Sequence, residues 1–255
     1  DGNFYGFNSD GSIVNGFPFN VGSDIRSSTA VGDLDNDGQN ELVFGSNQGR
    51  IHILNQNGSQ EYSYYASGII WGAPVLADLD SDQDLEIIFT TENANNGDLY
   101  AIHHNGELVE GFPANIDEKM MVGPAVGDLE GDGIMDIVIA TWGENIIALD
   151  AFGNIKEGFP YASTKRFNSP PTLADIDGNG TFEIIAGNDD GLLHILYFDG
   201  TEMISFDTGD DIRGGISISD LNDDGSLELL FVGYDDKIHV WNPTLNQELD
   251  GWPID

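Results

Sequence analysis

Five short segments of this 255-residue chain carry oxygen-bearing side chains at alternate positions. Each segment begins with aspartate and has a carboxylate or amide at positions three, five and nine, and the backbone carbonyl at position seven is expected to join them. Alternate residues of a tight loop converge on one point, and Ca²⁺ takes about six to eight oxygen ligands. The pattern therefore predicts up to five calcium sites. Their expected ligands are Asp33, Asp35, Asp37, Gln39 and Glu41; Asp78, Asp80, Asp82, Asp84 and Glu86; Asp128, Glu130, Asp132, Ile134 and Asp136; Asp175, Asp177, Asn179, Thr181 and Glu183; and Asp220, Asn222, Asp224, Ser226 and Glu228.

Position six of these loops needs a residue that tolerates a sharp turn. Four loops have glycine there, whereas the second loop has Gln83, so we expect that loop to be strained, altered or weaker. Mg²⁺ and Zn²⁺ are less favoured, because Mg²⁺ retains waters in a near-octahedral shell and Zn²⁺ prefers nitrogen and sulfur. The four glycines are Gly38, Gly133, Gly180 and Gly225.

An EF-hand and a metal-free turn both fit the acidic segments less well than a calcium loop does. An EF-hand loop requires a bidentate glutamate at position twelve and flanking helices, but position twelve is apolar in all five segments. Asp, Asn and Gly also form turns without any metal, which accounts for one segment but not for five repeats of the same spacing. The residues at position twelve are Phe44, Phe89, Ile139, Ala186 and Phe231.

The spacing of the loops indicates a repeat architecture. Their first aspartates are 45, 50, 47 and 45 residues apart, which is the length of a propeller blade. Apolar runs on both sides of each loop predict two strands, a third strand follows, and a fourth comes after another turn. The third strands are expected at 50–55, 98–103, 145–150, 192–197 and 237–242.

We therefore predict an all-β fold, a β-propeller of four-stranded antiparallel blades, rather than a sandwich, because a sandwich does not require the same unit to recur. Residues 1–255 are interpreted as one propeller domain with complete blades at 21–67, 68–115, 116–162, 163–208 and 209–255. Residues 1–20 match only strands three and four of a blade. Either residues that precede Asp1 complete this blade, or the sheet remains open at one blade; we expect a fragment of a longer protein, with six blades the favoured count.

Composition restricts the partners. The formal net charge is −37, and eight lysines and arginines are too few for a basic nucleic-acid surface. No apolar run is long enough for membrane insertion. The absence of cysteine excludes a thiolate metal site and a cysteine nucleophile.

The segment GDLDNDGQNELVFGS (32–46) and its four relatives resemble the FG-GAP or VCBS-type repeat family, which includes the integrin α propeller. The FG and GAP signatures themselves are degraded, and the recurring GFP segments are more similar to bacterial secreted repeat proteins. The resemblance implies structural calcium loops on one face, with ligands engaging the opposite face. It also implies a secreted or cell-surface location and a non-catalytic role in adhesion or ligand binding.

Half of the scarce cations lie at equivalent places. Arg26, Lys119, Arg166 and Arg213 come seven or nine residues before the first aspartate of their loops, and Trp71 lies nearby in the second copy. These five residues are interpreted as a basic and aromatic rim for a protein or an acidic glycan, because arginine pairs with carboxylates in a bidentate geometry. The alternative is that the cations neutralise neighbouring acids.

The five histidines and the acidic residues do not form a recognisable catalytic motif in the sequence. His52, His194 and His239 share one position of strand three and are expected to be packing residues, while His103 and His104 are expected to be exposed. No catalytic triad or acid–base pair stands out from the aspartate background. A lectin-like carbohydrate-binding propeller and the propeller of a polysaccharide lyase are the alternatives to an adhesion module.

Overall fold

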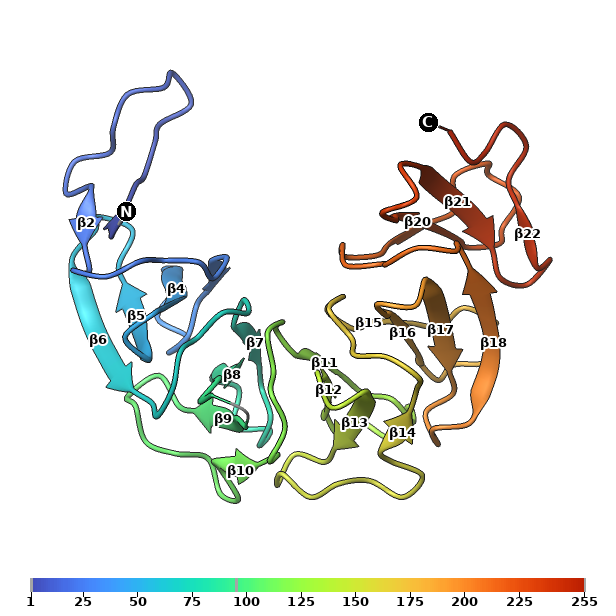
Figure 1. Cartoon of the computed structure of the whole chain (residues 1–255). Helices are drawn as coiled ribbons and strands as arrows, with labels where there is room; N and C mark the ends of the chain where they lie inside the picture. The colour runs from blue at the N-terminus through green and yellow to red at the C-terminus, as the bar shows by residue number, and fades with distance from the viewer. Residues whose placement is uncertain (1, 95, 255) are drawn as a thin grey trace. The chain divides into compact units, whose positions relative to one another are not determined.

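A computed structural model describes residues 2–94 and 96–254. The regular secondary structure in this part of the chain consists of β-strands. Strands that follow one another along the chain pair in antiparallel fashion. They form five four-stranded sheets and one two-stranded sheet (Figure 1). The two-stranded sheet pairs β1 (Asn3–Phe4) with β2 (Phe19–Asn20).

The four-stranded sheets repeat one topology. The first contains β3 (Ala30–Gly32), β4 (Glu41–Ser46), β5 (Arg50–Leu54) and β6 (Gln60–Tyr65). The second contains β7 (Val75–Ala77), β8 (Glu86–Thr90), β9 (Asp98–Ile102) and β10 (Ala114–Asn115). The third contains β11 (Ala125–Gly127), β12 (Asp136–Ala140), β13 (Asn145–Leu149) and β14 (Tyr161–Ala162). The fourth contains β15 (Thr172–Ala174), β16 (Glu183–Gly187), β17 (Leu192–Leu196) and β18 (Glu202–Asp207). The fifth contains β19 (Ser217–Ser219), β20 (Glu228–Val232), β21 (Ile238–Asn242) and β22 (Gln247–Glu248).

Each acidic loop connects the first strand of a sheet to the second. In the fourth sheet Ala174 pairs with Glu183, so positions one to eight of the loop lie between these two residues. The second and third strands are the most apolar, and β8, β12 and β16 are buried at every residue. Strands that are covered on both faces have continuous apolar runs in their sequence, without the alternation of apolar and polar residues seen in half-exposed strands.

The chain divides into two compact units. Unit 1 extends to Pro124 and includes Phe152–Asn154, and unit 2 contains Ala125–Ala151 and the residues from Ile155 onward. Within unit 1, Ile51 and Ile53 of the first sheet pack in one core with Ile87 and Phe89 of the second. Within unit 2, a second core joins the fourth and fifth sheets and includes the wholly buried Trp241. Apolar burial between neighbouring sheets is therefore the main stabilising contribution in each unit.

The predicted fold class is confirmed, since four-stranded antiparallel sheets recur and the five third strands occupy the expected segments. The assignment of 1–255 to one domain with the blade limits given above stays a prediction. No helix with the length and apolar character needed to cross a bilayer occurs among residues 2–94 and 96–254.

Candidate functional site

The five acidic loops share a backbone conformation at two positions. In every loop φ is 59–75° at position four and 81–90° at position six. Gln83 adopts this conformation with φ 81°, where the other loops have glycine. A residue with a side chain costs about 1–2 kcal/mol in the left-handed region, so the second loop has the strain that its sequence indicated.

The aspartate at position one organises each loop from within. In the fourth loop the two carboxylate oxygens of Asp175 accept the backbone N–H groups of Asn179 at 3.0 Å and Gly180 at 2.9 Å. The corresponding aspartates of the other four loops accept the same two N–H groups. The side chain at position five accepts the N–H of position seven at 2.7–2.9 Å in all five loops. Hydrogen bonds within each loop therefore hold its oxygen atoms in place.

The acidic residue at position nine is the buried member of each loop. Glu41, Glu86, Asp136, Glu183 and Glu228 are between 0% and 3% exposed. One oxygen of each accepts the backbone N–H of position two at 2.7–3.3 Å. Burial raises the pKa of Glu41, Glu86, Asp136 and Glu183, because a carboxylate removed from water is harder to ionise. A cation beside these groups would offset that cost.

The second oxygen of the position-nine carboxylate distinguishes the loops. In the fourth loop Oε1 of Glu183 is buried and has no hydrogen-bond partner among the described residues. In the fifth loop Asn242 Nδ2 donates to Oε1 of Glu228 at 2.9 Å. In the second loop Nδ1 of His103 lies 3.0 Å from Oε1 of Glu86.

The third loop contains its own cation. Nζ of Lys156 lies 2.7 Å from Oδ1 of Asp136 and 3.1 Å from Oε2 of Glu130, so it bridges positions nine and three. Burial by itself would lower the pKa of Lys156, but its hydrogen bonds and ion pairs with Asp136 and Glu130 raise it. Lys156 stays protonated at neutral pH, and its ammonium group occupies a place between two predicted metal ligands.

Three loops bring carboxylate oxygens close enough to share one ion. The ligand atoms lie within 4.8 Å of one another in each of the sets Asp33, Asp35 and Glu41; Asp78, Asp80 and Asp82; and Asp175, Asp177 and Glu183. Among the described His, Asp and Glu side chains, no set of three that includes an acid of the third or fifth loop meets this distance. Position three of the fifth loop is the amide Asn222, which is outside this set of side chains. The expected convergence is thus seen in the first, second and fourth loops, and metal binding by all five stays a prediction.

The histidines divide into two kinds. His52, His194 and His239 are 3–4% exposed, which confirms that they are packing residues. The stacking of His52 on Phe44 and of His239 on Phe231 repeats that of Tyr100 on Phe89, with ring centroids 5.1–5.2 Å apart. The expected exposure of His103 and His104 is wrong, since both are half-buried beside the second acidic loop. The turn that follows β9 brings them there, a contact that periodicity within one repeat does not show.

The predicted rim residues of unit 1 form one connected group. The guanidinium of Arg26 lies over the ring of Trp71, 4.4 Å from its centroid. Nε1 of Trp71 donates to Glu92 at 3.3 Å, and Lys119 pairs with the other oxygen of Glu92 at 3.3 Å. Glu92 follows β8 and precedes β9, so the group lies at the end of the second sheet opposite its acidic loop.

The rim residues of unit 2 meet at one acid that the sequence interpretation missed. Arg166 and Arg213 both bind Asp189, whose side chain is 8% exposed. Burial favours the neutral acid, but hydrogen bonds from Asn168, Arg166 and Arg213 outweigh this effect and lower the pKa of Asp189. Arg166 also lies over Trp142, 4.1 Å from the ring centroid. These cations neutralise an acid and stack on an aromatic ring at the same time.

A pocket of about 550 Å³ adjoins the group in unit 1. Its wall includes Asn47, Gln48, Tyr65, Ile69 and Glu92. Oδ1 of Asn47 is buried without a hydrogen-bond partner among the described residues, and the side chain of Tyr65 is largely exposed. Amide groups beside an exposed aromatic ring are suited to a ligand that is polar at its edges and apolar on one face.

Repeated four-stranded sheets with an acidic first turn define a β-propeller protein of the repeat class. A family model described as FG-GAP-like repeat matches residues 33–89 and 78–139, which include the first three acidic loops. Residues 33–139 thus carry FG-GAP-like repeats, as the resemblance indicated. A comparison of the sequence with curated proteins finds no match.

Solved structures share the fold at low sequence identity. The chain is similar to the C-terminal domain of PilY1 from Pseudomonas aeruginosa, with a TM-score of 0.70, 11% identity and coverage of 96% of this chain and 78% of that one. BamB from Moraxella catarrhalis gives a TM-score of 0.63 at 17% identity, covering 89% of this chain and 62% of BamB. The V. cholerae biofilm matrix protein Bap1 gives 0.55 at 21% identity, covering 91% of this chain and 34% of Bap1. The chain spans less than two thirds of BamB and of Bap1, and these similarities establish the fold.

Proposed function

We propose that this chain is a calcium-stabilised, non-catalytic β-propeller that acts outside the cell as an adhesion or ligand-binding module. The observation that carries the calcium part is Oε1 of Glu183, a buried carboxylate oxygen without a hydrogen-bond partner among the described residues. Glu183 belongs to a set of three acidic side chains with ligand atoms within 4.8 Å of one another. A buried carboxylate is costly unless it is paired or coordinates a metal, and an all-oxygen set suits Ca²⁺.

Calcium would act on stability rather than on chemistry. The first and fourth loops supply the most direct oxygen sites, because each brings positions one, three and nine together. Extracellular modules bind Ca²⁺ at about 10⁻⁴–10⁻³ M. A site held at ten to a hundred times its dissociation constant adds about 1.4–2.7 kcal/mol to the free energy of unfolding. Two or more such sites would add a large part of the stability of a domain.

The test of the calcium proposal is thermal unfolding of the whole chain in EDTA and again after Ca²⁺ is restored. We expect the melting temperature to fall by many degrees in EDTA and to recover with Ca²⁺, because several sites are lost together. Mg²⁺ at the same concentration serves as the control and should restore little. An EDTA-treated chain that melts at the same temperature would remove the calcium proposal.

Recognition is proposed for the end opposite the acidic loops. The pocket in unit 1 and the neighbouring group of Arg26, Trp71 and Lys119 combine amides, aromatic rings and scarce positive charge. A protein or an acidic glycan fits this combination. Structural neighbours include a biofilm matrix protein and BBS1N in complex with ARL6DN, which supports a role in binding.

Arg26 offers the cleanest test of the recognition surface. It stacks on Trp71, while Arg213 of unit 2 is bound to Asp189 and Asp211. Arg26→Ala is expected to reduce binding to acidic ligands on glycan and peptide arrays with little change in melting temperature. Lys165→Ala, at an exposed residue, is the matched loss of one positive charge. Equal losses of binding in the two variants would indicate a general charge effect and would contradict a specific surface.

A further inference from the structure

The second acidic loop departs from the other four at two separate places. Gln83 stands where the others have glycine, and a histidine follows the third strand of its sheet. The residue at this position of the repeat approaches the loop, as Asn242, the last residue of β21, does in the fifth sheet. The residues that correspond to His103 are Asn55, Asp150, Tyr197 and Asn242, none of which offers an imidazole nitrogen.

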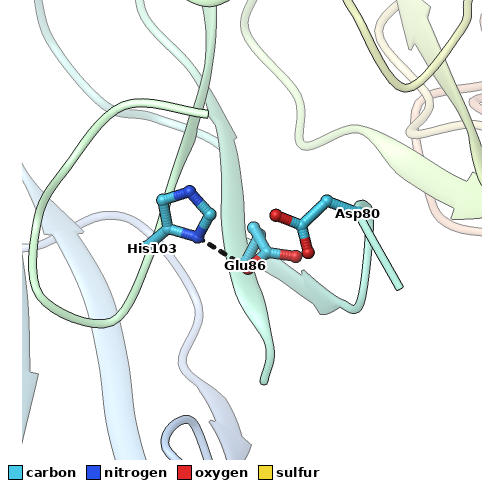
Figure 2. Close-up of side chains that lie close together, drawn as sticks. All are labelled: Asp80, Glu86 and His103. Carbon is cyan, nitrogen blue, oxygen red and sulfur yellow. Dashed lines mark hydrogen bonds and ion pairs between the residues drawn. The ribbon is translucent and has the colours of Figure 1, made fainter. Parts of the chain in front are cut away.

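His103 meets the acids of this loop at close range. Figure 2 shows its imidazole, the carboxylate of Glu86 at the start of β8 and the carboxylate of Asp80 in the loop. One ligand atom from each of the three side chains lies within 4.8 Å of the other two. Nδ1 of His103 lies 3.0 Å from Oε1 of Glu86, which is fully buried. The His103 side chain is 24% exposed, so the group is reached from solvent.

The turn that contains His103 is well defined. The backbone N–H of His103 donates to Glu107 O at 2.9 Å, and the N–H of Gly106 donates to His103 O at 2.9 Å. Ile102 and Leu108 form a bridge directly beside it. The imidazole is therefore presented by a short, hydrogen-bonded turn, and little ordering remains to be lost when a ligand binds.

One imidazole nitrogen with two carboxylates is a different donor set from that of the other loops. Ca²⁺ takes oxygen ligands, whereas Zn²⁺ and related ions take imidazole nitrogen together with carboxylate oxygen. We propose that Asp80, Glu86 and His103 form a site for a divalent transition-metal ion of the Zn²⁺ class, with water completing its coordination. Asp80 and Glu86 are also expected Ca²⁺ ligands of the second loop, so Zn²⁺ would take the place of Ca²⁺ in this loop. The proposal does not depend on Ca²⁺ binding by the other four loops.

The alternative is that His103 only donates a hydrogen bond to the buried acid, as Asn242 does to Glu228 at 2.9 Å. His103→Asn separates the two roles. Asparagine at this position keeps a donor for Glu86, as the fifth sheet demonstrates, but removes the imidazole nitrogen. A hydrogen-bonding role predicts unchanged Zn²⁺ binding in this variant, and a ligand role predicts its loss.

The experiment is calorimetric titration of Zn²⁺ into the full chain, stripped of metal and held in excess Ca²⁺, with Co²⁺ as a visible-absorption probe of the same site. We expect one Zn²⁺ per chain at high affinity. Residues that merely orient a metal ligand change affinity by about 10–100-fold, so His103→Asn should weaken Zn²⁺ by at least about 100-fold. Co²⁺ absorption should disappear in the same variant, and its melting temperature should stay close to that of the native chain.

His104→Asn is the matched control, because His104 lies in the same turn but its Nε2 faces Asp84, 3.7 Å away. It should retain Zn²⁺ binding and Co²⁺ absorption. The proposal is overturned if the native chain shows no Zn²⁺ site in excess Ca²⁺, if His103→Asn binds as tightly as the native chain, or if His104→Asn loses as much affinity as His103→Asn. Loss of the EDTA effect on melting would instead contradict the calcium proposal alone.

Discussion

The third and fourth acidic loops share a backbone conformation but differ in the groups that lie beside their buried position-nine acid. Both have positive φ at positions four and six, and in both the buried position-nine acid accepts the N–H of position two. In the third loop Lys156 bridges Asp136 and Glu130, whereas Oε1 of Glu183 in the fourth loop has no partner among the described residues. The repeat thus preserves the loop, and a residue from the neighbouring turn gives the third loop a positive charge of its own. In the calcium proposal, the fourth loop takes its positive charge from solution.

Lys156 occupies a place that is apolar in other copies. Its backbone N–H donates to Ala148 O, as Val109 donates to Ala101 O in the second sheet. The alignment of VEGFP (109–113) with KEGFP (156–160) shows the same substitution in the sequence. A lysine that replaces an apolar residue of a repeat is therefore a signal that one site of the set has changed its chemistry.

The largest effect is expected from removal of the internal cation. Lys156→Met leaves Asp136 buried without its partner, and breaking a buried ion pair costs about 3–5 kcal/mol. Because Glu130 is 40% exposed, we expect about 3 kcal/mol in urea unfolding without calcium. Ca²⁺ should restore part of this loss, and equilibrium dialysis should show one additional bound ion. Lys165→Met, at an exposed residue, should change neither quantity. An equal loss of stability in that variant would contradict a special role for Lys156 in the third loop.

At the fourth loop we expect a smaller change in the free energy of unfolding, with one sign in the absence of Ca²⁺ and the other in its presence. Glu183→Gln removes a buried charge, so without calcium the free energy of unfolding should stay level or rise. With Ca²⁺ the variant should lack the stabilisation of about 1.4–2.7 kcal/mol that one well-occupied site supplies. Urea unfolding with and without Ca²⁺ measures both. Asp136→Asn in the third loop should destabilise under both conditions because it loses Lys156. Identical behaviour of the two variants would contradict the difference between the loops.

The smallest effect concerns the loop backbone that all copies share. Gln83→Gly removes a side chain from the left-handed region and should raise the melting temperature by the equivalent of about 1 kcal/mol. Gly180→Gln in the fourth loop, where φ is 90°, should lower stability by a similar amount. Calorimetric melting of both variants tests the equivalence of the two loops. An unchanged melting temperature in Gln83→Gly would indicate that the second loop relaxes around its glutamine.

The spacing of acidic turns at 45, 50, 47 and 45 residues, with apolar runs between them, was sufficient to predict the four-stranded sheets and their order. Local chemistry also predicted the loop conformation, since the glycines at position six and the strained Gln83 adopt the expected backbone. The strands and loop turns could be predicted because each depends on residues a few positions apart, and the same local pattern recurs in every copy.

Only the tertiary structure decided which side chains lie beside the buried acid of each loop. His103 is 17 residues from Glu86, and Lys156 is 26 residues from Glu130, so their contacts require the correct pairing of strands and turns. The pairing of Lys119 with Glu92, and of Arg166 and Arg213 with Asp189, depends on long-range contacts for the same reason. Sequence by itself determined the repeated strands and acidic loops, because each of them forms from residues that are close together in the chain. The chemistry of each copy came from long-range contacts, because the free energy of a buried carboxylate depends on the groups that folding places beside it.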